Sequence, residues 1–155
     1  MPLVMGGGFV NTELRSISEK HFFDYVDYLI LDDGELPMLK LIQFLDGCIP
    51  ETDLIRTFYV KDNRLIYSGN DTQILPFAES GTPDFTGISL SKYISLSEMV
   101  NPMHRLWSCG QWNKMMVAHG CYWAKCAFCD TTLDYICRYD PPSATSVVDK
   151  MERIM

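Results

Sequence analysis

The chain lacks the features that would place it in a membrane or on nucleic acid. No segment approaches the roughly 18 to 20 apolar residues that a bilayer crossing needs, and no charged stretch followed by an apolar run opens the chain. Lysine and arginine are scattered, and the net charge of the 155 residues is −7, so no clustered basic surface is available to neutralise phosphates. These absences predict a soluble, cytoplasmic protein with neither a membrane nor a nucleic acid as its partner.

The sequence also lacks internal repeats, low-complexity tracts and an export signal. The last of these matters because the chain has six cysteines, which are expected to stay reduced in the cytoplasm. A hydrophobic content of 47% is enough to bury a core. We therefore predict that Cys48, Cys109 and Cys137 are buried thiols in a globular α/β protein.

The first half of the chain alternates between strand and helix patterns. A short apolar strand at 3–5, a helix at 12–23 and a second strand at 26–31 predict a parallel strand pair. The apolar spacing of residues 34–44 predicts a second helix, with Gly47 as its stop. Strand patterns at 56–60 and 64–67 flank the polar turn Lys61, Asp62 and Asn63, which predicts a β-hairpin.

The second half has a different organisation. Residues 75–102 are rich in Pro, Gly, Ser and Asp without sustained periodicity, which is typical of a surface connection. Residues 112–118 have a strand pattern, and 143–155 have helix-start chemistry followed by helical spacing. We predict a first domain at 1–74, a linker at 75–111 and a second domain at 112–155.

Three cysteines lie close together between the last predicted strand and helix. Cys121, Cys126 and Cys129 are too close for all of them to satisfy disulfide geometry, but such thiolates can surround a soft metal centre. An iron–sulfur cube held by three cysteines leaves one iron open for a substrate. A structural zinc site with His119 as the fourth ligand is the alternative that the residues leave open.

The residues around these cysteines carry a family resemblance. The run from His119 to Asp130, HGCYWAKCAFCD, resembles the cluster loop of radical S-adenosylmethionine enzymes, and in particular of those with an N-terminal cobalamin-binding domain. Three further motifs of that subgroup precede it in the same order: a Gly-Gly strand end at 6–7, an Asp-Gly-Glu turn at 33–35 and a Pro-Asp-Phe-x-Gly linker at 83–87. The ordered series spans most of the chain and is more specific than any single motif.

The resemblance implies that Cys121, Cys126 and Cys129 hold a [4Fe–4S] cluster whose open iron binds S-adenosylmethionine. Reductive cleavage of that cofactor would then give a 5′-deoxyadenosyl radical that abstracts hydrogen from a substrate. Phe128 matches the aromatic position that packs near the adenine in the family.

Two departures from the family pattern predict a fragment. Four residues separate Cys121 from Cys126, where the commonest pattern has three, and only Asp130 to Met155 follow the last cysteine. A complete barrel needs roughly 200 residues or more. The chain is therefore predicted to hold part of a doubly wound, cobalamin-binding-like parallel sheet with a hairpin, followed by the first β-loop-α unit of a partial TIM barrel. Its partners would be the remainder of the barrel, or a second copy paired through exposed strand edges.

Two turns in the first half admit a functional and a structural interpretation. Gly6 and Gly7 could let a nucleotide tail of a cofactor approach the backbone, with cobalamin bound in the full-length parent as the resemblance implies, but a tight turn needs glycine as well. Asp32, Asp33 and Glu35 could face a ligand cleft, or they could be exposed acids at a helix start. The alternative for the whole chain is a non-catalytic α/β module with a zinc-bound or empty cysteine loop that acts in protein contacts.

Overall fold

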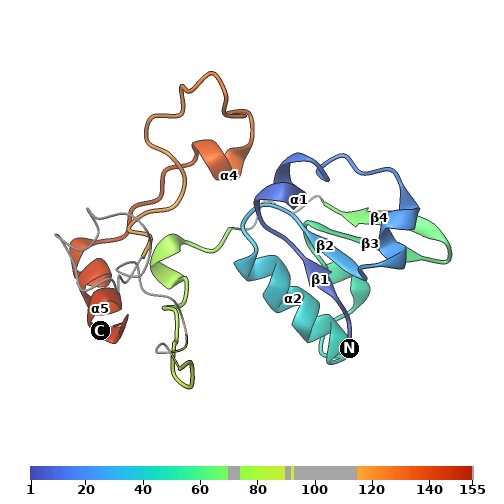
Figure 1. Ribbon diagram of the computed structural model, residues 1–155, viewed down its shortest axis with the longest axis horizontal. Coiled ribbons are helices and arrows are strands. Elements are labelled where there is room, and N and C mark those ends of the chain that lie inside the picture. Colours follow the sequence, from blue (N-terminus) through green and yellow to red (C-terminus); the bar gives the residue numbers. More distant parts are fainter. Residues whose placement is uncertain (70–73, 90–91, 93–114, 155) are drawn as a thin grey trace. The chain divides into compact units, whose positions relative to one another are not determined.

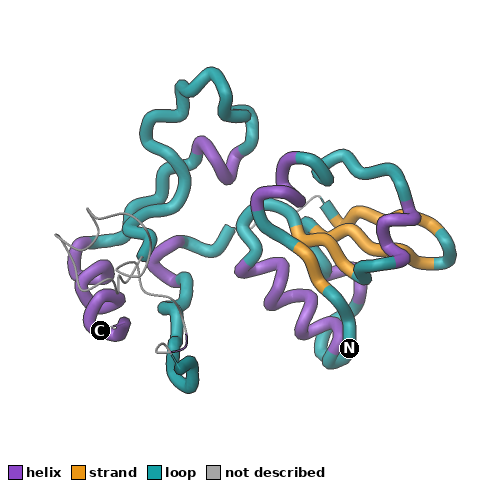
Figure 2. Tube along the Cα trace, viewed as in Figure 1, coloured by secondary structure: helices purple, strands orange, loops and turns teal. Residues whose placement is uncertain are grey.

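The computed structural model describes residues 1–69, 74–89, 92 and 115–154. These residues divide into two compact units, unit 1 at Met1–Pro76 and unit 2 at Phe77–Met155. Figures 1 and 2 show that the strands lie in unit 1, whereas unit 2 consists of loops and short helices over the described residues. No helix in the described part of the chain is long and apolar enough to cross a bilayer.

Unit 1 is a mixed α/β structure built on one four-stranded sheet. The sheet order is β1-β2-β3-β4, with β1 and β2 parallel and the other two pairs antiparallel. The predicted parallel pair and the predicted hairpin are both confirmed. The strands are β1 (Val4–Met5), β2 (Tyr28–Ile30), β3 (Thr57–Lys61) and β4 (Arg64–Ser68).

The alternating direction of side chains along the central strands explains why apolar residues are buried on both faces of the sheet. On one face, Leu29 and Phe58 pack with Val10 of α1 (Gly8–Thr12). On the other face, Ile30 and Tyr59 pack with Leu41 of α2 (Glu35–Leu45). Because successive strand residues point to opposite faces, the continuous apolar run of β2 buries side chains on both sides.

The helix α2 and the hairpin turn confirm two further predictions. Gly47, just beyond α2, has φ 74°, a left-handed conformation that glycine adopts without strain. Asp62 and Asn63 have φ 49° and 59° between the paired residues Lys61 and Arg64. Positive φ at both central positions gives the turn the twist that a two-residue hairpin needs.

The helix predicted at 12–23 is wrong. The structure has the short helix α1 (Gly8–Thr12), a turn, and the 3-10 helix η1 (Lys20–Asp24) instead. Leu14, Ile17 and Phe22 nevertheless pack against the core. The helical spacing therefore identified the residues that face the sheet, but a folded turn presents them equally well.

In its described part, unit 2 contains a 3-10 helix, η3 (Phe77–Glu79), and the α-helices α4 (Asp134–Cys137) and α5 (Ala144–Ile154). The helix predicted at 143–155 is confirmed over α5, whereas α4 was not predicted. The strand predicted at 112–118 is wrong over its described residues, 115–118. The next residue, His119, forms an isolated bridge with Asp140, and no described neighbour extends this pairing into a strand. Residues 112–114, Cys109 and much of the predicted linker at 75–111 lie outside the described residues.

Candidate functional site

The cysteine loop of unit 2 begins and ends at one short backbone bridge. The amide of His119 donates to the carbonyl of Asp140 over 3.1 Å, and the amide of Asp140 donates back to His119 over 3.0 Å. Gly120 has φ 72°, and a β-carbon there would overlap the carbonyl oxygen of Arg138. Only glycine fits this crossing of the two loop ends.

A second set of contacts holds the base of the loop to the rest of unit 2. The Oδ2 atom of Asp140 accepts a hydrogen bond from the amide of Phe77 over 2.7 Å, and the Phe77 ring stacks on His119 with centroids 6.1 Å apart. The Nζ atom of Lys150 on α5 donates to the Phe77 carbonyl and to Ser80 Oγ, both over 2.9 Å. The loop base, the 3-10 helix η3 (Phe77–Glu79) and α5 are thus one hydrogen-bonded group.

The cysteines occupy two separate turns of the loop. The amide of Ala124, which has φ 45°, lies 3.4 Å from the Sγ atom of Cys121 and donates to it. The amide of Cys129 donates to the carbonyl of Cys126 over 3.1 Å, and the amide of Thr131 donates to Cys129 over 2.9 Å. Cys126 and Cys129 are therefore held in a tight turn. Only Lys125 separates this turn from Ala124, whose amide donates to Cys121 Sγ.

All three cysteines are free thiols and half-buried. Within the described residues, no three His, Cys, Asp or Glu side chains are gathered to hold a metal ion. The donor set, three free thiols on one loop, suits a soft metal centre, but the structure does not bring the three sulfurs together. A metal would have to gather them, as it does in small domains where binding and folding are coupled.

The remaining cysteines in the described residues do not match their prediction. Cys48 and Cys137 are exposed rather than buried. Cys48 follows the C-terminal end of α2 and Cys137 is the last residue of α4. Helix ends lie at the surface, so their side chains have no core to enter.

Aromatic side chains on the cysteine loop point into solvent. Phe128 is 92% exposed, and Tyr122 and Trp123 are exposed as well. The Nζ atom of Lys125 lies 5.7 Å from the ring centroid of Trp123. Large exposed aromatic side chains beside free thiols are typical of a surface that is completed by a ligand or a partner.

The glycine turn of unit 1 lies at the carboxyl end of β1. Gly6 approaches the neighbouring strand, since a β-carbon there would lie 3.4 Å from the Ile30 carbonyl oxygen. Gly7 precedes α1 and has φ 90°, which glycine adopts most readily. The structural role predicted for this turn is therefore met, and the cofactor role stays a prediction.

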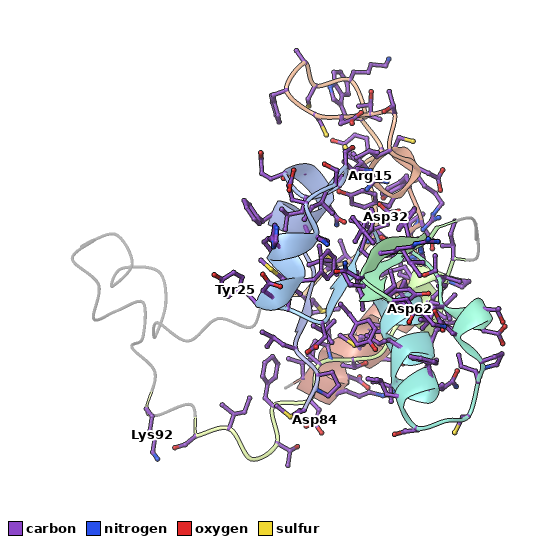
Figure 3. All side chains as sticks on the ribbon, turned by 90° about the vertical axis from the view of Figure 1, so that its right-hand side faces the viewer. Arg15, Tyr25, Asp32, Asp62, Asp84 and Lys92 are labelled. Atoms are coloured by element: carbon purple, nitrogen blue, oxygen red, sulfur yellow. The ribbon has the colours of Figure 1, made fainter. Side chains whose placement is uncertain are left out.

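The acidic turn after β2 is part of a partly buried polar cluster. Asp32 has φ 60°, and its Oδ1 atom accepts a hydrogen bond from Arg15 Nη1 over 2.6 Å (Figure 3). Its amide donates to Asn11 Oδ1 over 2.6 Å. Asp33 is buried, whereas Glu35 is an exposed acid in the first turn of α2. The interpretation of the turn as exposed acids holds for Glu35 and is wrong for both aspartates.

Two further members of this cluster escaped the sequence analysis. Arg56, the residue before β3, is only 6% exposed, and its carbonyl oxygen accepts a hydrogen bond from Leu31 over 2.9 Å. Tyr67 on β4 stacks on Phe58 with ring centroids 4.3 Å apart. Burial, and then the charge of Asp32, raise the pKa of Tyr67, while Arg15 and then Arg56 act in the opposite direction. The only signal in the sequence was a lone arginine within an otherwise uncharged, β-rich run at 54–60.

Comparison of the chain with protein-family models, with curated proteins and with solved structures finds no match. The assignment of the site therefore depends on the chemistry and geometry of the residues described above.

Proposed function

We propose that this chain is part of a radical S-adenosylmethionine enzyme and that its cysteine loop binds a [4Fe–4S] cluster through Cys121, Cys126 and Cys129. The observation that carries the proposal is the presence of three free, half-buried thiols on one loop whose two ends are bridged at His119 and Asp140. A closed loop confines the three ligands to a small volume, which lowers the entropic cost of gathering them around a metal.

The loop residues have distinct roles in this proposal. The three thiolates hold the cluster, and the amide of Ala124 donates to Cys121 Sγ, which stabilises negative charge on sulfur. Phe128, which projects into solvent, would cover the adenine of the cofactor. The bound cluster with S-adenosylmethionine supplies the chemistry, reductive cleavage to a 5′-deoxyadenosyl radical, and the chain holds and shields these groups.

The proposal extends to the parent protein. The mixed sheet of unit 1, with helices over both faces, is consistent with part of a cobalamin-binding-like domain, and unit 2 with the start of the barrel. The remainder of that barrel is the partner that would complete the exposed aromatic surface of the loop. Cobalamin would belong to the full-length protein, near Gly6 and Gly7.

Anaerobic reconstitution with iron and sulfide tests the cluster directly. Iron, sulfide and zinc per chain are measured together with visible and electron paramagnetic resonance spectra. We expect about four irons with matching sulfide for the unaltered chain. Cys126→Ala is expected to lose them, and the matched control Cys137→Ala, which removes an exposed thiol outside the set, is expected to keep them.

Two results would contradict the proposal. Stoichiometric zinc that survives in competition with iron would identify a structural zinc site. An equal iron content in the Cys126→Ala and Cys137→Ala proteins would show that iron binds without this ligand set.

A further inference from the structure

Arg56 is a buried cation with unused hydrogen-bond donors on two of its three guanidinium nitrogens. Its side chain is nine-tenths buried, and neither Nε nor Nη2 has a hydrogen-bond partner among the residues that the structure describes. These two nitrogens form one edge of the guanidinium group, where their N–H bonds run parallel. A buried cation with unused donors is destabilising, because it loses its water without gaining an acceptor.

The backbone fixes Arg56 at an edge of the sheet where ligands often bind. Its carbonyl accepts from the amide of Leu31, which directly follows β2, so Arg56 lies beside the carboxyl end of that strand. Its own φ of 47° is a left-handed value that costs energy in a residue with a side chain. In open α/β sheets, ligands bind outside the carboxyl ends of strands.

The carboxylate of Asp32, which follows Leu31 in the chain, is already paired with another arginine. Asp32 Oδ1 accepts from Arg15 Nη1 over 2.6 Å, with side-chain exposures of 15% and 28%, and Asn11 holds the Asp32 backbone. Arg15 and Asp32 are labelled close to one another in Figure 3. Because Asp32 Oδ1 is engaged by Arg15, an added anion at the Nε and Nη2 edge would supply the acceptors that the described residues do not give to these two nitrogens.

We propose that the Nε and Nη2 edge of Arg56 binds an oxyanion, the phosphate or carboxylate group of a small ligand, at the carboxyl end of β2. Two parallel N–H donors match two oxygens of such a group, a geometry that arginine offers and lysine does not. Since both nitrogens are buried, the anion must displace a covering side chain, and we expect slow exchange between the free and bound states. This site lies in unit 1 and does not depend on the cluster proposed for unit 2.

Arginine side-chain NMR tests the site on the full chain. The Nε–H resonance of Arg56 is assigned by its loss in Arg56→Met, and the wild-type chain is titrated with inorganic phosphate against sodium chloride of equal ionic strength. We expect a new, downfield Nε–H signal in phosphate that is absent in chloride. A parallel titration with acetate shows whether a carboxylate serves as well, and thereby distinguishes the two chemical sources.

Matched variants supply the second readout. The thermal midpoint of the wild-type chain is expected to rise with phosphate concentration, because a ligand that binds only the folded state stabilises it. Arg64→Met, which removes an exposed arginine from β4, should keep this rise, and Arg56→Met should lose it. An Arg56 signal that responds equally to chloride and phosphate, or a thermal shift that persists in Arg56→Met, would overturn the proposal.

Discussion

The two units of the chain are stabilised in different ways. Unit 1 has a sheet with two buried apolar clusters, one on each face, and side chains such as Leu29 and Leu41 are fully buried. In the described part of unit 2, the only residues under one-tenth exposed are Phe77 and Lys150, and these two contact each other. Unit 1 therefore depends on apolar burial, whereas unit 2 depends on a few hydrogen bonds around one aromatic ring.

The unit with the larger stabilising contributions is not the unit that carries the candidate metal ligands. Fully burying a leucine contributes about 1.5–3 kcal/mol, while a hydrogen bond contributes about 0.5–1.5 kcal/mol net. The three candidate ligands Cys121, Cys126 and Cys129 lie in the unit with fewer such contributions. A weakly held loop can rearrange to gather ligands, which a densely packed core would resist.

The largest expected effect comes from a cavity in unit 1. Leu29→Ala should lower the free energy of unfolding of unit 1 by about 2–5 kcal/mol, because Leu29 is 0% exposed at the centre of the sheet. Hydrogen exchange at 28–30 measures this loss. No tryptophan occurs in the sequence of unit 1, and Trp123 lies in the described part of unit 2, so tryptophan fluorescence should report an unchanged transition there. A coincident loss of both signals would show that the units unfold together.

A substitution at the loop base should have the next largest effect, and in unit 2. Gly120→Ala places a methyl group against the Arg138 carbonyl at a positive φ, so we expect a loss of about 2 kcal/mol or more. Tryptophan fluorescence during urea unfolding measures it. Gly81→Ala, where a β-carbon meets no described atom within 4 Å, is the control and should change little. Equal effects of the two changes would contradict the geometry of the bridge.

The lysine that joins η3 to α5 gives a smaller effect. Lys150→Met keeps the apolar stem but removes the buried ammonium that donates to the Phe77 carbonyl and to Ser80 Oγ, which should cost about 1–3 kcal/mol. Limited proteolysis of α5 measures the loosening. Lys125→Met, on the exposed loop, serves as the control and should leave cleavage of α5 unchanged. Unaltered protection in Lys150→Met would show that the hydrogen bonds add nothing to unit 2.

The smallest expected effect is a pH dependence confined to unit 1. Hydrogen bonds from Lys61 and then Tyr59 hold the pKa of Glu51 below its usual range. A lowered carboxyl pKa in the folded state stabilises the fold above the ordinary glutamate pKa, and this contribution disappears as the pH falls through the folded value. The thermal midpoint should therefore drop on acidification. In Glu51→Gln the corresponding part of the drop should be missing, and an identical pH profile would exclude this linkage.

The sequence predicted the regular parts of unit 1 well because its signals there are redundant. The apolar run of β2 and the Asp62–Asn63 turn each favour one local structure, and the sheet agrees with both. The segment at 12–23 failed because Leu14, Ile17 and Phe22 satisfy the core from a turn as well as from a helix. Periodicity identifies which side chains face the core, but not the backbone that carries them.

A candidate site could be predicted from the sequence only where its residues are close together along the chain. Cys121, Cys126 and Cys129 lie on one loop, so sequence spacing was enough to single them out. Arg56 becomes a candidate only when the pairing of β2 and β3 buries it beside Leu31, which is distant in sequence. No spacing rule reports a contact that the sheet register creates.

The hydrogen bonds that run from the His119–Asp140 bridge through Phe77 to Lys150 also couple the loop to α5. Thermodynamic linkage is reciprocal. A ligand that orders the cysteine loop must therefore stabilise α5, and an ordered α5 must strengthen binding at the loop by the same free energy. The stability of α5 therefore reports, at a distance, whether the cysteine loop has bound a metal. Hydrogen exchange at α5 would follow the state of the cysteines without a probe on the loop itself.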